Sequence, residues 1–219
     1  MNDGLSRFFY RETVQDSGVG DEKVIRQRGG VGVYAHVQVA VHALSRGQGM
    51  ELAWNAGLNI PPRFAAAVVR GLQDALNSGV LAGLELTDVY ASVENGSYHE
   101  EDSTADAFRE AAAKATTKAL RGARPLILEA LASVSITVPK EFIEVVETTV
   151  ASHHGQATTM RSEAPLQSVT TDLPAVHLIE LMAELLRITE GHARISTATA
   201  GFRPRPEPPD TIEEWVAHR

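Results

Sequence analysis

The order of strand-like and helix-like segments in the second part of the chain most constrains the fold. Two segments with an apolar stripe begin at Pro139 and Pro174 and are followed by Gly155 and Gly191. Proline suits the first turn of a helix, and glycine suits the residue just after its end. Strand-like segments flank these helices in the sequences LASVSIT, ATTMRSE, LQSVTTD and ARISTAT. The order strand–helix–strand–strand–helix–strand is typical of the ferredoxin-like split βαβ fold.

The first part of the chain combines strands with two further helices. The stretch HVQVAVHAL (36–44) alternates valine with other residues, which predicts a half-buried strand. One helix is expected to begin at Pro62 and to end before Gly79. A second helix is expected to follow Ser103, whose hydroxyl can cap its first turn. The other predicted strands are FFYRETV (8–14), EKVIRQR (22–28), MELAW (50–54) and LELTDVYASVE (84–94).

Pro125 separates the two parts and predicts a domain boundary. We therefore expect an α+β protein in which residues 1–125 form a mixed α/β domain and residues 126–203 a ferredoxin-like βαββαβ domain. Residues 204–219 are expected to form a Pro-rich linker and a short C-terminal helix. The reason is that RPRPEPP favours extended chain and Asp210 can cap the segment after it.

Composition limits the classes of function. The chain has 219 residues, of which 43% are hydrophobic and 22% charged, as in ordinary soluble globular proteins. No apolar run approaches the roughly 18–20 residues that cross a bilayer, and the first residues lack the basic-then-apolar order of a secretory signal. The absence of cysteine excludes disulfides and thiolate chemistry, and it agrees with a reducing, cytoplasmic location.

Charge argues against a general nucleic-acid binder. The net charge is −8, whereas proteins that bind nucleic acid without selectivity are usually basic. Residues 1–125 hold 13 Lys and Arg against 15 Asp and Glu, and residues 126–219 hold 7 against 13. Lys23, Arg26 and Arg28 cluster beside a glycine-rich stretch, so a bound anion is expected there.

Two separated stretches repeat one combination of residues. IRQRGGVGVYAHVQV holds three glycines with Tyr34 and His36, and ENGSYHEEDSTADAF holds a glycine with Tyr98 and His99. Tyrosine and histidine can stack on bases, and glycine lets the backbone approach RNA closely. The two stretches are therefore interpreted as one contact surface. The alternative is structural, with Tyr34 and Tyr98 packed against each other at the end of a hairpin.

Enzymatic and metal-binding functions have weaker support. His36 and His99 could form an acid–base pair with a carboxylate among residues 100–102, but the chain has no nucleophile motif and no phosphate-binding GxxxxGK[ST] motif. His153 and His154 could bind a metal, or could simply be exposed at a helix end, where the helix dipole favours them. We therefore expect no catalytic residue, no metal site and no cofactor.

Several segments resemble elongation factor G, the GTPase that drives translocation on the ribosome. YRETV followed by KVIRQRGGVGVYAHVQV is similar to the opening of its domain IV, and ALNSGVLAGLELTDVYASVENGSYHEEDSTADAFREAA is similar to the rest of that domain. PLILEALASVSITVPKEF, HHGQ and HLIELMAELLRITEGHARI resemble domain V. The resemblance covers nearly the whole chain, in order.

This resemblance implies a two-domain relative or fragment without the G domain and domains II and III. In the family, domain IV is an elongated α/β unit that mimics the tRNA anticodon arm, and its tip loops enter the decoding centre during tRNA–mRNA translocation. Domain V is ferredoxin-like. The implied partners are the ribosome, tRNA and mRNA, with no membrane. GTP and Mg²⁺ would bind the G domain of the parent protein, so this chain is not expected to be an enzyme.

The resemblance also implies which residues contact RNA. The first tip loop would use Arg28, Gly29, Gly30, Gly32, Tyr34 and His36. The second tip loop would use Gly96, Ser97, Tyr98, His99, Asp102 and Ser103.

The first tip loop departs from the family's GRGQYGH pattern, because this chain has GVGVYAH. Val31 and Val33 remove a charge and an amide, and Ala35 is expected to stiffen the loop. The tail RPRPEPPDTIEEWVAHR replaces the usual aromatic tail. Two alternatives therefore stay open: a stand-alone ribosome- or RNA-binding regulator, and a ribosomal-protection relative of the kind that displaces tetracycline.

Overall fold

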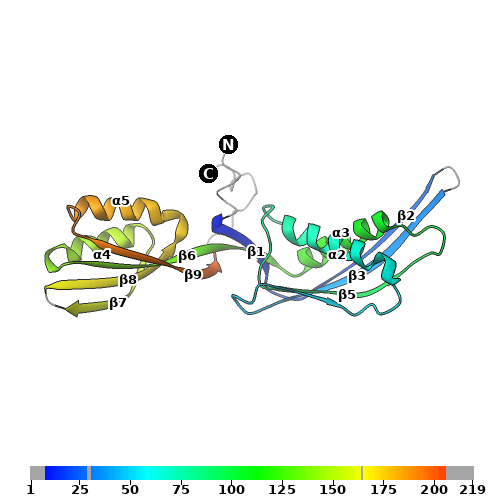
Figure 1. Cartoon of the computed structure of the whole chain (residues 1–219), viewed down its shortest axis with the longest axis horizontal. Helices are drawn as coiled ribbons and strands as arrows, with labels where there is room; N and C mark the ends of the chain where they lie inside the picture. The colour runs from blue at the N-terminus through cyan, green and yellow to red at the C-terminus, as the bar shows by residue number, and fades with distance from the viewer. Residues whose placement is uncertain (1–7, 29–30, 164, 206–219) are drawn as a thin grey trace. The chain divides into compact units, whose positions relative to one another are not determined.

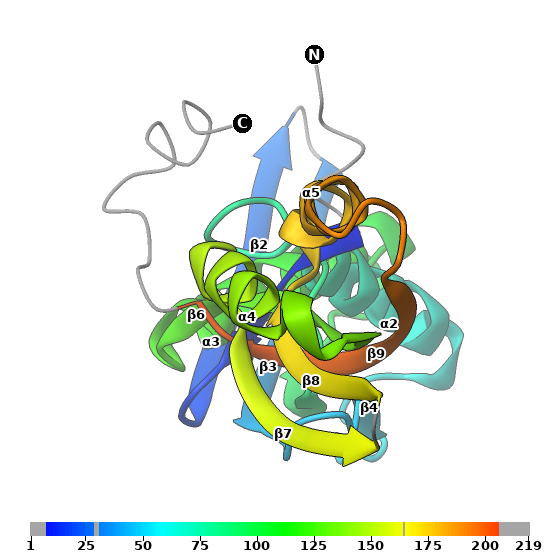
Figure 2. The same ribbon diagram turned by 90° about the vertical axis from the view of Figure 1, so that its left-hand side faces the viewer.

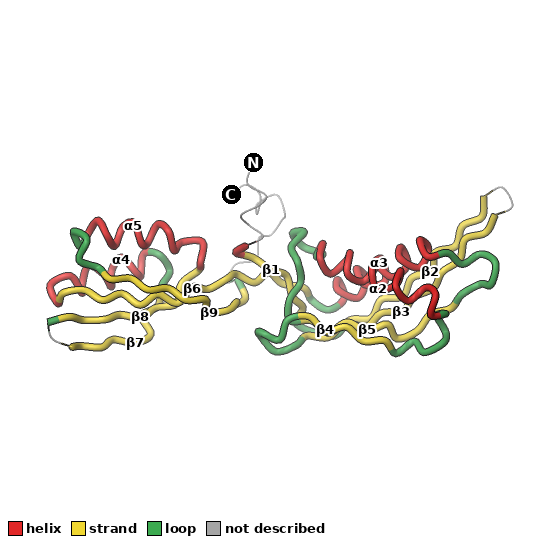
Figure 3. The backbone as a smooth tube through the Cα atoms, in the orientation of Figure 1, coloured by secondary structure: helices red, strands yellow, loops and turns green. Residues whose placement is uncertain are grey.

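The computed structural model describes residues 8–28, 31–163 and 165–205. It divides into two compact units, the first built mainly of Tyr10–Leu128 and the second mainly of Glu129–Pro204. Both units contain helices and strands (Figures 1 and 3), which confirms the predicted α+β class. The C-terminal helix expected after Asp210 lies outside the described residues, as do Gly29 and Gly30.

The first unit is a four-stranded sheet with two helices on one face (Figure 1). The order across the sheet is β2-β3-β5-β4, with β2, β3 and β5 antiparallel and β4 parallel to β5. The bounds are β2 Gly18–Arg28, β3 Val31–Ala43, β4 Met50–Trp54, α2 Pro62–Ser78, β5 Val89–Ser97 and α3 Ala105–Gly122. As predicted, Pro62 lies at the start of α2 and Gly79 follows its end with a φ of 61°.

Helix α3 lies directly on β2 because small residues line both elements. The alanines of α3 that face the sheet are buried, as are the valines at the centre of β3. A Cβ placed on Gly20 would stand 1.9 Å from the carbonyl oxygen of Ala115, and one on Gly18 would stand 2.1 Å from that of Ala119. Only glycine allows the helix backbone to approach the strand this closely.

These contacts explain where the predicted strand boundaries were wrong. The sequence predicts a strand over 22–28, but β2 already begins at Gly18, because Gly18 and Gly20 pack against α3. β3 begins at Val31, so residues 32–36 belong to a strand and not to a loop. Ala35 is fully buried in the core, so it does not stiffen an exposed tip.

The cap of α3 also differs from the prediction. Thr104 is the N-cap, and its Oγ1 accepts a hydrogen bond from the backbone N–H of Ala107 at 3.2 Å. Ser103 is bonded elsewhere, as described below.

A buried carboxylate organises the segment that follows α2. Glu12, in β1 (Tyr10–Val14), is fully buried, and its side chain accepts four backbone N–H groups. Val80 and Leu81 donate to Oε2 at 2.6 and 3.0 Å, and Ala82 and Leu84 donate to Oε1 at 2.8 and 3.2 Å. These bonds compensate for burying the charge, because each oxygen has its acceptor sites filled.

The second unit confirms the predicted βαββαβ order. Its sheet has the order β7-β8-β6-β9, and Figure 2 shows α4 and α5 together on one face of it. The bounds are β6 Pro125–Pro139, α4 Ile143–Ser152, β7 Gln156–Glu163, β8 Leu166–Pro174, α5 Leu178–Ile188 and β9 Arg194–Pro204. Pro139 and Pro174 each precede a 3-10 turn that leads into the helix. β1 pairs with β6, which begins within the first unit.

In the part of the chain that the structure describes, no helix combines the length and the apolar character that a membrane crossing requires.

We predict that Gly20→Ala lowers the free energy of unfolding by about 1–3 kcal/mol, because the new methyl group would overlap the Ala115 carbonyl. Gly122→Ala is the matched control, since nothing lies within 4 Å of its added Cβ, and it should leave stability unchanged or slightly raised. Urea denaturation measures both. Equal effects of the two substitutions would contradict the packing argument.

We predict that Glu12→Gln destabilises the protein by about 2–4 kcal/mol, because an amide NH₂ would face backbone N–H donors in place of an acceptor oxygen. Glu51→Gln, at an exposed position of β4, should change stability by less than about 0.5 kcal/mol. Equilibrium unfolding of both variants provides the measurement, and a neutral Glu12→Gln would refute the role given to the carboxylate.

Candidate functional site

Strand pairing brings together the two stretches that contain Tyr and His. β3 and β5 are antiparallel, and His36 lies directly opposite Ser97. β2 and β3 form a hairpin in which Arg28 pairs with Val31, and this hairpin extends beyond the helices (Figure 1). The predicted site residues Gly29 and Gly30 connect the two strands and lie outside the described residues.

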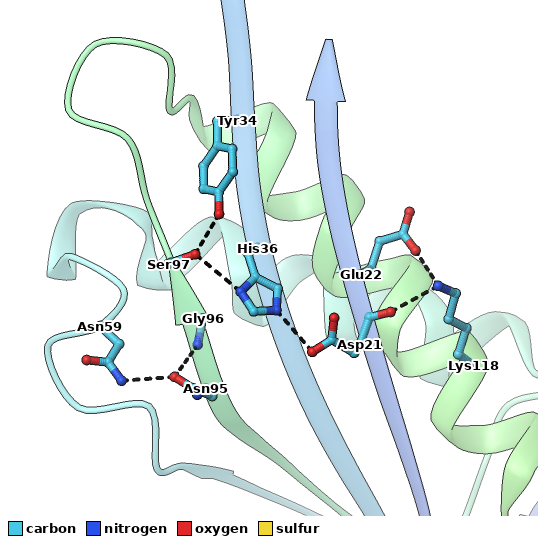
Figure 4. Close-up of polar contacts among 9 residues, drawn as sticks. All are labelled: Asp21, Glu22, Tyr34, His36, Asn59, Asn95, Gly96, Ser97 and Lys118. Carbon is cyan, nitrogen blue, oxygen red and sulfur yellow. Dashed lines mark hydrogen bonds and ion pairs between the residues drawn. The ribbon is translucent and has the colours of Figure 1, made fainter.

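Ser97 joins Tyr34 and His36 on the face of the sheet that the helices leave uncovered (Figure 4). Its hydroxyl oxygen lies 2.7 Å from the Tyr34 hydroxyl and 3.2 Å from His36 Nδ1. The Nε2 of His36 lies 3.0 Å from the carboxylate of Asp21. In a consistent assignment with a neutral ring, His36 donates from Nε2 to Asp21 and accepts from Ser97, whose oxygen accepts from Tyr34.

Further polar side chains, which no sequence motif indicated, lie around this hydrogen-bonded group. Lys118 of α3 donates to the carbonyl oxygen of Asp21 at 2.9 Å and lies 2.6 Å from the carboxylate of Glu22. On β5, the Oδ1 of Asn95 accepts from Asn59 Nδ2 at 2.9 Å (Figure 4). These partners depend on strand register, so no local sequence signal identifies them.

The segment between β5 and α3 folds back onto β3. The backbone N–H of Tyr34 donates to the carbonyl oxygen of Asp102 at 2.9 Å, and the Ser103 hydroxyl donates to the Tyr34 carbonyl at 2.8 Å. Ser103 Oγ also accepts from the N–H of His99 at 2.9 Å. Ser103 therefore connects the two predicted tip segments, and this explains why it does not cap the helix.

Two of the predicted site glycines have a role inside the fold. A Cβ on Gly32 would stand 2.4 Å from the carboxyl carbon of Asp102. A Cβ on Gly96 would stand 2.5 Å from the carbonyl oxygen of His36 and 2.6 Å from Ile60 Cδ1. The missing side chains let the tip segments lie against each other.

Tyr98 and His99 present the most accessible ring side chains of the predicted set. Tyr98 is 45% exposed and the His99 side chain 56%. His99 Nδ1 lies 3.3 Å from both the backbone nitrogen and the carboxylate of Asp102. Tyr34 is instead half-buried with its hydroxyl on Ser97, and within the described ranges no ring contact joins it to Tyr98.

The predicted cation cluster is divided between the two faces of β2. Arg26 turns toward α3 and forms an ion pair with Glu110, which Lys114 also contacts at 2.8 Å. The hydrogen bond from Lys114, followed by its charge and that of Arg26, lowers the pKa of Glu110. Lys23 lies opposite His36 in the register and is exposed. Arg28 ends β2, but its side chain lies outside the described set.

His36 and His99 belong to separate hydrogen-bonded groups. The first bonds to Ser97 and Asp21, the second to Asp102. No contact between the two histidines occurs among the residues that the structure describes. The arrangement therefore offers two exposed rings beside a fixed polar surface, which suits binding better than shared acid–base chemistry.

Comparison with known proteins gives the family. The model of elongation factor G, domain IV, matches residues 7–124, and that of the elongation factor G C-terminus matches residues 126–212. Neither is the model of a GTP-binding domain.

Individual proteins that resemble this chain point to the same family as the two family models. An elongation factor G-like protein of Thermotoga maritima is 35% identical over 190 residues, which are 86% of this chain and 28% of the relative. A crystal structure of a protein from Thermus thermophilus is similar with a TM-score of 0.82 and 29% identity, over 95% of this chain and 31% of that one. The chain thus spans less than a third of the length of these relatives. It belongs to the elongation factor G family, and it comprises that family's domain IV and C-terminal domain.

Proposed function

We propose that this chain is the ribosome-interacting C-terminal part of an elongation-factor-G-like translation factor. In this proposal, residues 1–125 act as domain IV and insert their tip into the decoding centre during tRNA–mRNA translocation. Residues 126–203 act as domain V, and residues 204–219 form the linker and tail. The G domain and domains II and III of the parent protein would bind GTP and Mg²⁺, and the site of action would be the cytoplasm.

The observation that supports the proposal most strongly is the construction of the tip. Tyr98 and His99 are exposed, while the backbone that carries them is bonded to β3 through Asp102 and Ser103. Exposed aromatic rings on a fixed backbone can stack on unpaired bases without a large loss of entropy on binding.

The charges of the chain favour contact with RNA at the tip over general affinity for RNA. The net charge is −8, and Arg26 is already paired with Glu110. Phosphate attraction at the tip therefore rests on Lys23 and Arg28 together with backbone N–H groups. Such a surface would depend on the rest of the ribosomal complex for avidity, which fits a part of a larger factor.

We predict that Tyr98→Ala with His99→Ala weakens ribosome binding about tenfold or more, because a stacked base contributes about 1–3 kcal/mol. His42→Ala with Tyr90→Ala is the matched control, since this ring pair, 5.9 Å apart, lies at the opposite end of β3 and β5. Co-sedimentation with 70S ribosomes across a salt series measures the affinities. Equal loss in both double variants would contradict the proposed tip.

A probing experiment tests the location of binding. The chain has no cysteine, so a single cysteine at Glu100 can carry a hydroxyl-radical probe, with Glu51→Cys as the distant control. We expect Glu100→Cys alone to cleave small-subunit RNA around the decoding centre. Cleavage elsewhere would contradict insertion of the tip.

The same binding measurements test the alternative of a stand-alone regulator. Absence of ribosome binding by this chain at low salt would exclude that alternative, because such a protein needs affinity of its own.

A further inference from the structure

We propose that the second unit carries a binding site for a divalent transition-metal ion such as Zn²⁺, with His153, His177 and Glu180 as ligands. His153 follows the end of α4, His177 ends the 3-10 turn before α5, and Glu180 lies in the first turn of α5. From the sequence, His153 is expected at an exposed helix end and no metal site is expected. In the structure the His153 side chain is mostly buried, since only 15% of it is accessible to solvent.

The three side chains converge from two helices that are far apart in the sequence. One potential ligand atom from each of them lies within 4.8 Å of the others. Tetrahedral zinc with bonds near 2.0–2.1 Å places its ligand atoms about 3.3–3.5 Å apart, so small rotations would close the site. His177 and Glu180 are three residues apart at the start of one helix and therefore lie on the same side of it.

A carboxylate already orients one of the proposed ligands. The Nε2 of His153 lies 2.9 Å from Glu184 Oε2. Metal-bound histidines characteristically bond their other ring nitrogen to a carboxylate, which fixes the ring and strengthens the ligand. In this proposal Nε2 of His153 keeps its bond to Glu184 and Nδ1 is the ligand atom. Glu184 is thus a positioning residue.

The donor set determines the class of metal. Two imidazole nitrogens and one carboxylate oxygen suit Zn²⁺ and its neighbours in the first transition row, and they suit Mg²⁺ or Ca²⁺ poorly. Three protein ligands leave one position for water or a fourth side chain.

His154 is the nearest candidate for that fourth position. Its ring centroid lies 5.4 Å from that of His177. His154 has a φ of 61°, in the left-handed region that usually holds glycine at a helix end. The chain therefore places an imidazole next to the cluster at a position whose left-handed backbone conformation disfavours residues other than glycine.

Metal titration tests the proposal. The chain is dialysed against a chelator, and Co²⁺ is then added while the visible absorption of the tetrahedral ion is followed; calorimetry with Zn²⁺ gives stoichiometry and affinity. We expect one ion per chain and a higher melting temperature with Zn²⁺. The absence of tetrahedral Co²⁺ absorption, or binding of several ions with equal weak affinity, would overturn the proposal.

Variants locate the site. Glu180→Gln and His153→Gln should each lower Zn²⁺ affinity at least about tenfold, and Glu184→Gln should lower it about 10–100-fold if the ring must be held in place. Glu180 is exposed, so its substitution should leave the fold intact. His192→Gln, outside the cluster in the same unit, is the control and should bind as the native chain does. Equal loss in His192→Gln, or no loss in Glu180→Gln, would refute this assignment.

Discussion

The close contact between α3 and β2 is the constraint on which the first unit depends. Gly18 and Gly20 leave no room for a side chain beneath the carbonyl oxygens of Ala115 and Ala119. Because the helix is fixed at this distance, its first turn lies beside β3, and the preceding segment can bond to the Tyr34 backbone. Lys118, on the same helix, then reaches Asp21. A packing requirement in the core thus determines the position of the candidate RNA-contacting tip.

The tip combines a fixed interior with an accessible edge. Ser97 forms hydrogen bonds with Tyr34 and His36. Because their polar atoms are already bonded within the protein, these two side chains mainly determine the shape of the surface. Tyr98 and His99 remain exposed beside them. This division of roles agrees with the proposed contact with RNA, and the net charge of −8 disfavours general affinity for nucleic acid.

The second unit has a different chemical character. Its ferredoxin-like sheet provides a platform on which the end of α4 and the start of α5 bring two histidines and a glutamate together. A metal there would tie the two helices to each other at their loops. This would stabilise the unit without taking part in the contacts proposed for the tip.

The local elements and the family could be predicted from the order of the residues. Alternating valines, prolines near helix starts and glycines after helix ends act over a few residues, so they predicted α2 from Pro62, the helices α4 and α5 that follow Pro139 and Pro174, and the βαββαβ order. Features that depend on strand register or on contacts between distant segments appear only in the folded chain. Gly18 and Gly20 fall outside the strand predicted over 22–28, because the helix contacts that define their role lie about a hundred positions away in the chain. The bond between Asp21 and His36 and the meeting of His153 with His177 follow from strand pairing and helix packing, which residue order alone does not encode.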